Sequence, residues 1–299
     1  GTLTLGGSSG AKAELRVAYT DLDTSNTGIA DMDLTGGVFN ATLSDITIGY
    51  HKSKTGTDTG TLTFDDGTIT ADSLTVGTGG VSHNGKANAN GTMTMRGGDF
   101  STGAAVLGEG TGKGTGTVNV EGGSFTASSL ALGQGATDAT YGDGTAAGTL
   151  NVAGGTVQIN GDASLGTGTA SSTGQISMTG GTMTVTGNVT NGVGTGTINV
   201  EAGSLAVTGD LDVDYLATVG TAGRTGSVSA GGAVSIGASG TMNIGLTDTA
   251  VSSATVGTAD FSNADSVWID LDRLNVGILH HNVNETVTGT LRLSNTGSN

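Results

Sequence analysis

Residues 148–166 read GTLNVAGGTVQINGDASLG, and this phrase predicts the fold of the chain. Apolar and polar residues alternate in three short segments, and each segment is followed by a turn containing glycine or by a closing glycine. Alternation with a period of two is typical of a β-strand that buries one face. The segments are too short, and too rich in glycine and β-branched residues, to be helices. The phrase therefore reads as three short strands.

The same phrase recurs along the chain in steps of 22–32 residues. Its first segment begins at Gly60, Gly91, Gly116, Gly148, Gly174, Gly196 and Gly226. A module of this size cannot bury its apolar face alone, but stacked copies can, with each strand pairing with the same strand of the next module. We therefore expect an all-β parallel β-solenoid (β-helix) of roughly 10 rungs, with about three short strands per rung.

The repeat also predicts which side chains form the core. The apolar positions of the first segment should point inward, namely Leu62, Phe64, Met93, Met95, Val118, Val120, Leu150, Val152, Ile176, Met178, Ile198 and Val200. The third segment should close on a glycine, at Gly77, Gly133, Gly166 and Gly237. The longer steps add residues at one corner, for example at 78–90 and 134–147, so we expect these loops to protrude along one edge.

Composition narrows the classes of function. The chain has 57 Gly, no Pro, no Cys, 3% aromatic residues and a formal net charge of −16. Few aromatics disfavour an ordinary enzyme core, and the absence of Cys excludes disulfides and thiol chemistry. The negative charge disfavours binding to nucleic acid. No apolar run is long enough for a transmembrane helix.

We expect a single elongated solenoid over residues 1–299. It would comprise irregular N-terminal rungs at 1–59, regular repeats at 60–245 and irregular C-terminal rungs at 246–299. The chain opens with GTLTL and closes with GTLRL, both of which read as first-segment phrases without an evident cap. Two interpretations stay open at this point: a piece of a longer repeat protein, or a subunit whose end rungs pair with other copies.

The phrases GTLNVAGGTVQINGDASLG and GTINVEAGSLAVTGDLDV resemble the Gly/Thr-rich repeats of bacterial autotransporter passengers and related large surface proteins. The segments TGTLTFDDGTITADSLTVG and ADFSNADSVWIDLDRLNVG are similar to extracellular proteins of that type, and the resemblance is clearest over residues 28–245. It implies secretion, a location outside or on the surface of a bacterial cell and a right-handed solenoid. It also implies a role in adhesion, biofilm matrix or surface coat. No catalytic motif of the family is matched.

The strongest candidate for a metal site is GDLDVDYL, where Asp210, Asp212 and Asp214 fall on one face of a strand. Three like charges in a row repel one another, and calcium binds carboxylate oxygens, so a calcium site is one interpretation. The other is a solvated outer face. The segment DLDTSNTG at 21–28 loosely resembles a calcium loop but lacks the required spacing, and a polar turn is the favoured interpretation there.

We expect a non-catalytic, extracellular structural or adhesive protein, not an enzyme, with no cofactor other than this calcium. Its partners would be other copies, joined head to tail through the end rungs into a filament, sheath or surface layer. Cell-surface polysaccharide is a second candidate partner. The alternative function is a polysaccharide-degrading or polysaccharide-binding β-helix protein, with Asp212 as its key carboxylate.

Overall fold

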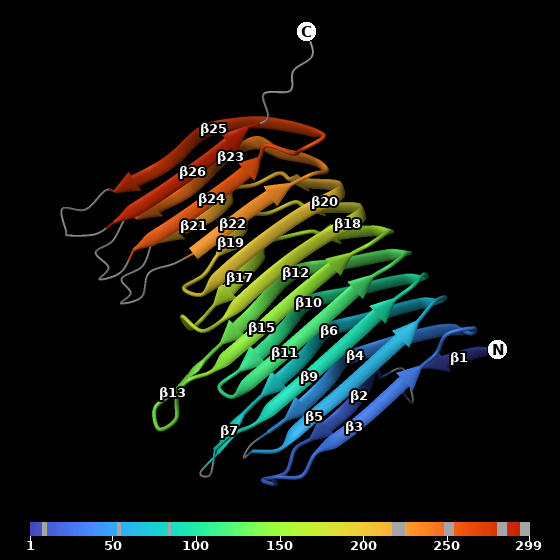
Figure 1. The fold of residues 1–299 in the computed structure, drawn as a ribbon. Coiled ribbons are helices and arrows are strands. Elements are labelled where there is room, and N and C mark those ends of the chain that lie inside the picture. The colour runs from blue at the N-terminus through green and yellow to red at the C-terminus, as the bar shows by residue number, and fades with distance from the viewer. Residues whose placement is uncertain are drawn as a thin grey trace.

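The computed structural model describes residues 1–7, 11–52, 55–82, 85–216, 225–247, 254–279 and 286–293. These residues form an all-β solenoid of stacked parallel strands, consistent with the expected right-handed β-helix. Figure 1 shows the stack, with β1 (Thr2–Leu5) at one end and β25 (Ser266–Leu279) and β26 (Val287–Leu293) at the other. Within the described ranges no helix is long and apolar enough to cross a membrane.

The Gly-Thr phrases form one continuous parallel ladder, which we call the first column. Gly60 pairs with Gly91, Gly91 pairs with Gly116, and the same position continues rung by rung to Gly289. The predicted register of the repeats is therefore confirmed. The ten described strands of this column are β3 (Gly28–Asp33), β5 (Thr57–Phe64), β9 (Asn88–Met95), β11 (Lys113–Val120), β15 (Thr145–Val152), the first parts of β18 (Thr173–Val185) and β20 (Thr195–Val207), β22 (Thr225–Ala230), β24 (Thr255–Phe261) and β26.

The other two segments of each rung form the second and third columns. In several rungs they are one long strand rather than two short ones, because the ladder bends while most of its pairing continues. At the bend between β6 and β10 the pair Asp72–Gly103 is skipped, and pairing resumes at Ser73–Ala104. The strands of these columns are β1, β2 (Ala13–Thr20), β4 (Val38–His51), β6 (Thr68–Gly79), β10 (Asp99–Gly110), β12 (Ser124–Gly135), β16 (Thr156–Ile159), β17 (Ala163–Thr167), the last parts of β18 and β20, β19 (Val189–Asn191), β21 (Leu211–Leu216), β23 (Ala233–Thr247) and β25.

The core is a narrow stack of like side chains between the columns. All the first-segment residues predicted to point inward are at most 4% exposed. Phenylalanines join this stack from the first and second columns: the ring centroids of Phe64 and Phe100 are 6.4 Å apart, and those of Phe100 and Phe125 are 5.3 Å apart and stacked. Each fully buried aliphatic or aromatic side chain stabilises the fold by about 1.5–3 kcal/mol. A few large residues per rung therefore suffice.

Two glycine positions face each other where the third column approaches the first. Gly148, from a Gly-Thr phrase, and Gly133, from the end of a third segment, illustrate the contact. A Cβ added to Gly148 would come within 3.0 Å of the backbone of Leu107 and of Gly133 itself. Gly133 also has a left-handed backbone, with φ of 70°. Both glycines are required because main chain packs directly on main chain here.

Two register predictions were wrong. Gly237 does not close a third segment, because residues 233–236 pair with 204–207 in the second column; the closing glycine of that rung is Gly245, with φ of 62°. The opening phrase GTLTL is also not a first segment, because β1 pairs with residues 38–41 in the second column. Short alternating phrases look alike in every column, so only the stacking of Leu3 on Phe39 distinguishes them.

The corner insertions protrude as predicted. The first folds as a hairpin of β7 (Val81–Ser82) and β8 (Gly85–Lys86), and the second as a hairpin of β13 (Thr137–Asp138) and β14 (Gly142–Asp143). Both hairpins are antiparallel and stand outside the main sheet. Figure 1 shows β7 and β13 along the same edge of the solenoid.

Candidate functional site

Asp210 lies in a ladder of side chains at the corner between the second and third columns. The backbone N–H of Asn188 donates to Asp162 Oδ1 at 2.8 Å, and that of Asp210 donates to Asn188 Oδ1 at 2.8 Å. The backbone N–H of Thr241 then donates to Asp210 Oδ1 at 2.6 Å. Each side chain therefore accepts a hydrogen bond from the next rung, which gives Asp210 a structural role.

Asp212 faces outward and belongs to a second ladder. Asn243 Nδ2 donates to Asp212 Oδ1 at 2.6 Å, and Asn275 Nδ2 donates to Asn243 Oδ1 at 2.7 Å. Asp214 lies two residues further along β21, and its side chain is outside the described part of the structure. Among the described residues, no three His, Asp or Glu side chains are grouped to hold a metal. The calcium site at Asp210, Asp212 and Asp214 stays a prediction.

The acidic segment at 21–28 is held by polar contacts at the N-terminal end. Lys52 Nζ lies 3.1 Å from Asp21 Oδ1. The fully buried His51 ring places Nε2 3.1 Å from the carbonyl oxygen of Thr24. Its Nδ1 lies 3.2 Å from Oδ1 of Asp58, which is also fully buried, and the backbone N–H of Gly28 donates to the same oxygen at 2.7 Å. These contacts hold the segment against the solenoid.

The buried pair His51–Asp58 was not predicted from the sequence. The two residues lie on β4 and β5, on either side of a corner, and no motif links them. Asp58 Oδ2 is buried without a hydrogen bond. His51 Nδ1 is likewise buried without a hydrogen bond, although it lies 3.2 Å from Asp58 Oδ1. We interpret the pair as a close polar contact that joins the two sides of this corner.

Aromatic side chains occur on the outer surface at two places. Trp268 on β25 is 69% exposed. The stack of Tyr19 on Tyr50, with centroids 4.5 Å apart, was not predicted, because it depends on the register of β2 with β4. Arg16 lies over the Tyr19 ring at 4.3 Å, and partial burial raises the pKa of Tyr50. The Tyr19 ring therefore packs against both Tyr50 and Arg16.

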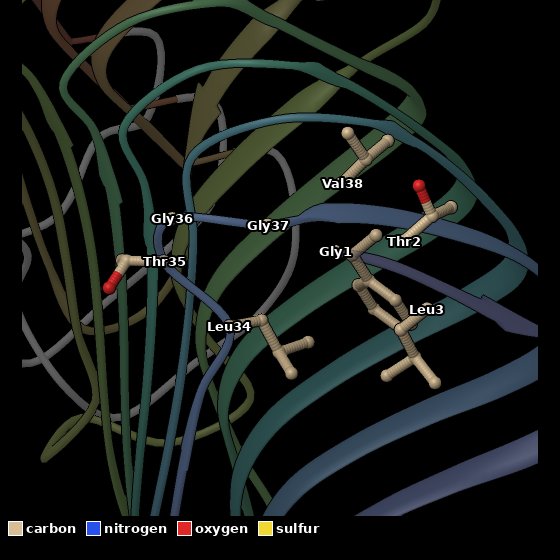
Figure 2. A pocket seen from close by; sticks show the side chains of 9 residues that line it. Gly1, Thr2, Leu3, Leu34, Thr35, Gly36, Gly37 and Val38 are labelled. Atoms are coloured by element: carbon tan, nitrogen blue, oxygen red, sulfur yellow. The ribbon is translucent and has the colours of Figure 1, made fainter.

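The N-terminal end rung is open. Residues that the register places inward, such as Leu15 and Met32, are only partly buried. Leu3, which pairs with the buried Phe39, is 44% exposed. A hollow of about 400 Å³ opens beside Leu3, Leu34 and Phe39, and Figure 2 shows the first two side chains at its wall. The outer edges of β1, β2 and β3 pair with no strand among the described residues.

The C-terminal end rung is open in the same way. Leu274 of β25 is 46% exposed and Leu293 of β26 is 57% exposed, although both occupy inward positions of their columns. Arg292 Nη1 lies 3.1 Å from Asp260 Oδ2 in the preceding rung. Hydrogen bonds from the hydroxyl and backbone N–H of Ser262, together with Arg292, lower the pKa of Asp260 to about 2. This end therefore presents apolar side chains beside charged ones.

Comparisons with family models, with curated proteins and with solved structures give no match to this chain. The class of the protein therefore follows from its own geometry. It is a repeat protein whose modules stack into a parallel β-solenoid, with open strand edges in its first and last described rungs.

Proposed function

We propose that the protein is a non-catalytic structural or adhesive rod, located outside or on the surface of a bacterial cell, whose copies join head to tail. The observation that carries this proposal is the continuous parallel ladder, in which Gly60 pairs with Gly91 and the same position continues rung by rung to Gly289. A parallel ladder of this kind can be extended by strands of another chain.

Stacking along the solenoid axis would give a filament rather than a closed ring. A head-to-tail contact between two copies is heterologous, and along a straight axis it does not close. A row of paired rungs also makes a stiff rod, because each rung is held by main-chain hydrogen bonds to both neighbours. The loops at one edge would then be displayed at regular intervals along it.

The resemblance of the repeats to autotransporter passenger-type surface proteins supports the location. The repeated strands belong to a solenoid, which is the architecture that the resemblance implies. On this proposal, the outer hairpins and the exposed Trp268 are the surfaces available for adhesion. The display of these groups on a rigid rod requires no catalytic residue.

Sedimentation and negative-stain electron microscopy of the purified chain test the proposal. We expect rods that lengthen as the protein concentration rises, with a constant width. Monodisperse short rods at every concentration would contradict head-to-tail assembly. Matching rods from a variant with Trp268→Ala would show that the exposed aromatic side chain is not what holds the copies together.

A further inference from the structure

The outward face of the first column carries a regular array of neutral side chains. The register places three outward positions of each strand in rows that run from rung to rung, from β5 to β20, and Figure 1 shows these strands side by side. We call this surface the threonine face. Its first row is Thr59, Asn90, Thr115, Ala147, Thr173 and Thr195; its second is Thr61, Thr92, Thr117, Thr149, Gln175 and Thr197; its third is Thr63, Thr94, Asn119, Asn151, Ser177 and Asn199.

The threonine face contains no charged side chain, although the chain has a formal net charge of −16. Charges surround it instead. Asp31 and Asp260 lie in the same rows in rungs beyond it, Lys113 lies at one edge, and Glu121 follows the strand at the opposite edge. An ionised side chain is costly to remove from liquid water. The face is therefore suited to a partner that is itself uncharged.

The first two rows present hydroxyl groups that the protein does not use. Nine of their twelve residues are threonines, and every rung contributes at least one. Thr61 donates to Asp31 in the preceding rung, whereas the other eight hydroxyls have no hydrogen-bond partner among the described residues. Because threonine is β-branched, its χ1 angle is restricted. The hydroxyl and methyl groups therefore recur at similar places on successive rungs.

The third row forms an ordered border to this array. Asn119 Nδ2 donates to Thr94 Oγ1 at 3.1 Å, and Asn151 Nδ2 donates to Asn119 Oδ1 at 2.9 Å. These amides are bonded along the solenoid axis, so their positions are fixed by the neighbouring rungs. The groups available to a partner are therefore concentrated in the first two rows.

The spacing of the rungs is close to a repeat of ice. Neighbouring strands lie about 4.8 Å apart. In a tetrahedral network of water molecules joined by hydrogen bonds of about 2.75 Å, next-nearest oxygens lie about 4.5 Å apart. Over the five steps between six rungs the mismatch reaches about 1.5 Å, less than half a repeat, so the rows stay in phase with the network.

The spacing across the rows is also compatible with this lattice. Alternate residues of a parallel strand lie about 6.6 Å apart, and the same tetrahedral network repeats every ~7.3 Å along its hexagonal axis. Only one such step separates the first row from the second, so this mismatch does not accumulate. We propose that the threonine face binds ice. The inference uses inner rungs only and does not depend on head-to-tail assembly.

Two other uncharged or self-complementary partners fit the face less well. A polysaccharide surface is commonly bound by aromatic rings that stack on the sugars, and the three rows contain no aromatic residue. A second copy would need an apolar centre to its interface, whereas these rows are polar. An ice crystal is uncharged, is periodic in two directions and offers a donor or acceptor to each hydroxyl.

The outward face of the second column is the natural comparison. It also carries threonines, but several of its hydroxyls are used within the protein. Ser101 Oγ donates to Thr70 Oγ1 at 3.3 Å, and Thr182 Oγ1 donates to Thr156 Oγ1 at 3.4 Å. Asp99 also places a charge in this face. The second column therefore provides control positions rather than a second ice-binding surface.

Slow growth of ice from a dilute solution of the purified chain tests the proposal. Growing ice excludes ordinary solutes, whereas a protein that binds it is carried into the solid. We expect the wild-type chain to be enriched in the ice, and Thr117→Lys to lower this enrichment by about tenfold. Thr126→Lys is the matched control, because Thr126 is a partly exposed, outward threonine of the second column in the same rung.

Each outcome supports or overturns the proposal. Exclusion of the wild-type chain from ice would overturn it, whether or not the chain is retained on crystalline cellulose. Equal enrichment of wild type and Thr117→Lys, or equal losses in Thr117→Lys and Thr126→Lys, would also overturn it. Urea midpoints show whether the variants are folded, and Thr92→Lys repeats the test one rung away. A chain that binds ice but stays monomeric would support this inference and contradict head-to-tail assembly, so the two proposals fail separately.

Discussion

Replacement of Gly133 by alanine tests the contact between the glycine positions of the first and third columns. Gly133 has φ of 70°, and a Cβ at this residue would come within 3.0 Å of the backbone of Thr173. The left-handed conformation costs an alanine about 1–2 kcal/mol. Overpacking against main chain that cannot rotate away adds about 1–3 kcal/mol. We therefore expect Gly133→Ala to lower the free energy of unfolding by about 2–5 kcal/mol.

Gly142 provides a matched control for this variant. Its φ of 71° is nearly the same, but it lies in the β13–β14 hairpin, and an added Cβ would have nothing within 4 Å. Gly142→Ala therefore incurs only the conformational cost, about 1–2 kcal/mol at most. Urea unfolding followed by circular dichroism compares the two variants. Equal urea midpoints for Gly133→Ala and Gly142→Ala would refute the close packing of the two backbones.

Three further predictions use the same unfolding assay. Ala18 occupies the glycine position of its rung with φ of 50°, so Ala18→Gly should stabilise the protein by about 1 kcal/mol; an unchanged or lower midpoint would contradict strain at this residue. Phe125→Ala should cost about 3–5 kcal/mol, because the ring is fully buried on Phe100, and a loss below ~1 kcal/mol would argue against the aromatic stack. Burial raises the pKa of Glu109, so its charged form opposes folding at neutral pH, and Glu109→Gln should raise the midpoint at pH 7. The difference should shrink as the pH falls toward the ordinary value of 4.5 and vanish below it, and a difference that grows on acidification would have the wrong sign.

The columns of the solenoid could be predicted from the sequence because the repeat carries its own register. Each Gly-Thr phrase places an apolar residue such as Leu150 two positions after the glycine, and the same spacing recurs in the next module. Inward and outward positions follow directly from this alternation. The position of the corner insertions was predictable for a related reason, since the extra residues occur between a third segment and the next glycine. Their folding as hairpins was not predicted.

Other features depend on contacts that no local pattern encodes. The phrase GTLTL has the composition of a first segment, yet β1 lies in the second column because its partners are Val38 to Ala41. Two contacts, His51 with Asp58 and Tyr19 with Tyr50, each join residues of different strands. These strands become neighbours only when the chain coils into the solenoid. For Asp210, the sequence indicated a carboxylate on a strand. It did not indicate that this carboxylate accepts a hydrogen bond from the backbone N–H of Thr241 in the next rung.

Helical reconstruction of the assembled protein by electron microscopy tests the head-to-tail rod most directly. Neighbouring strands of the first column lie about 4.8 Å apart, so stacked copies should show this strand spacing parallel to the filament axis. A strand spacing perpendicular to that axis, or a protein that forms no filament at any concentration, would contradict the account.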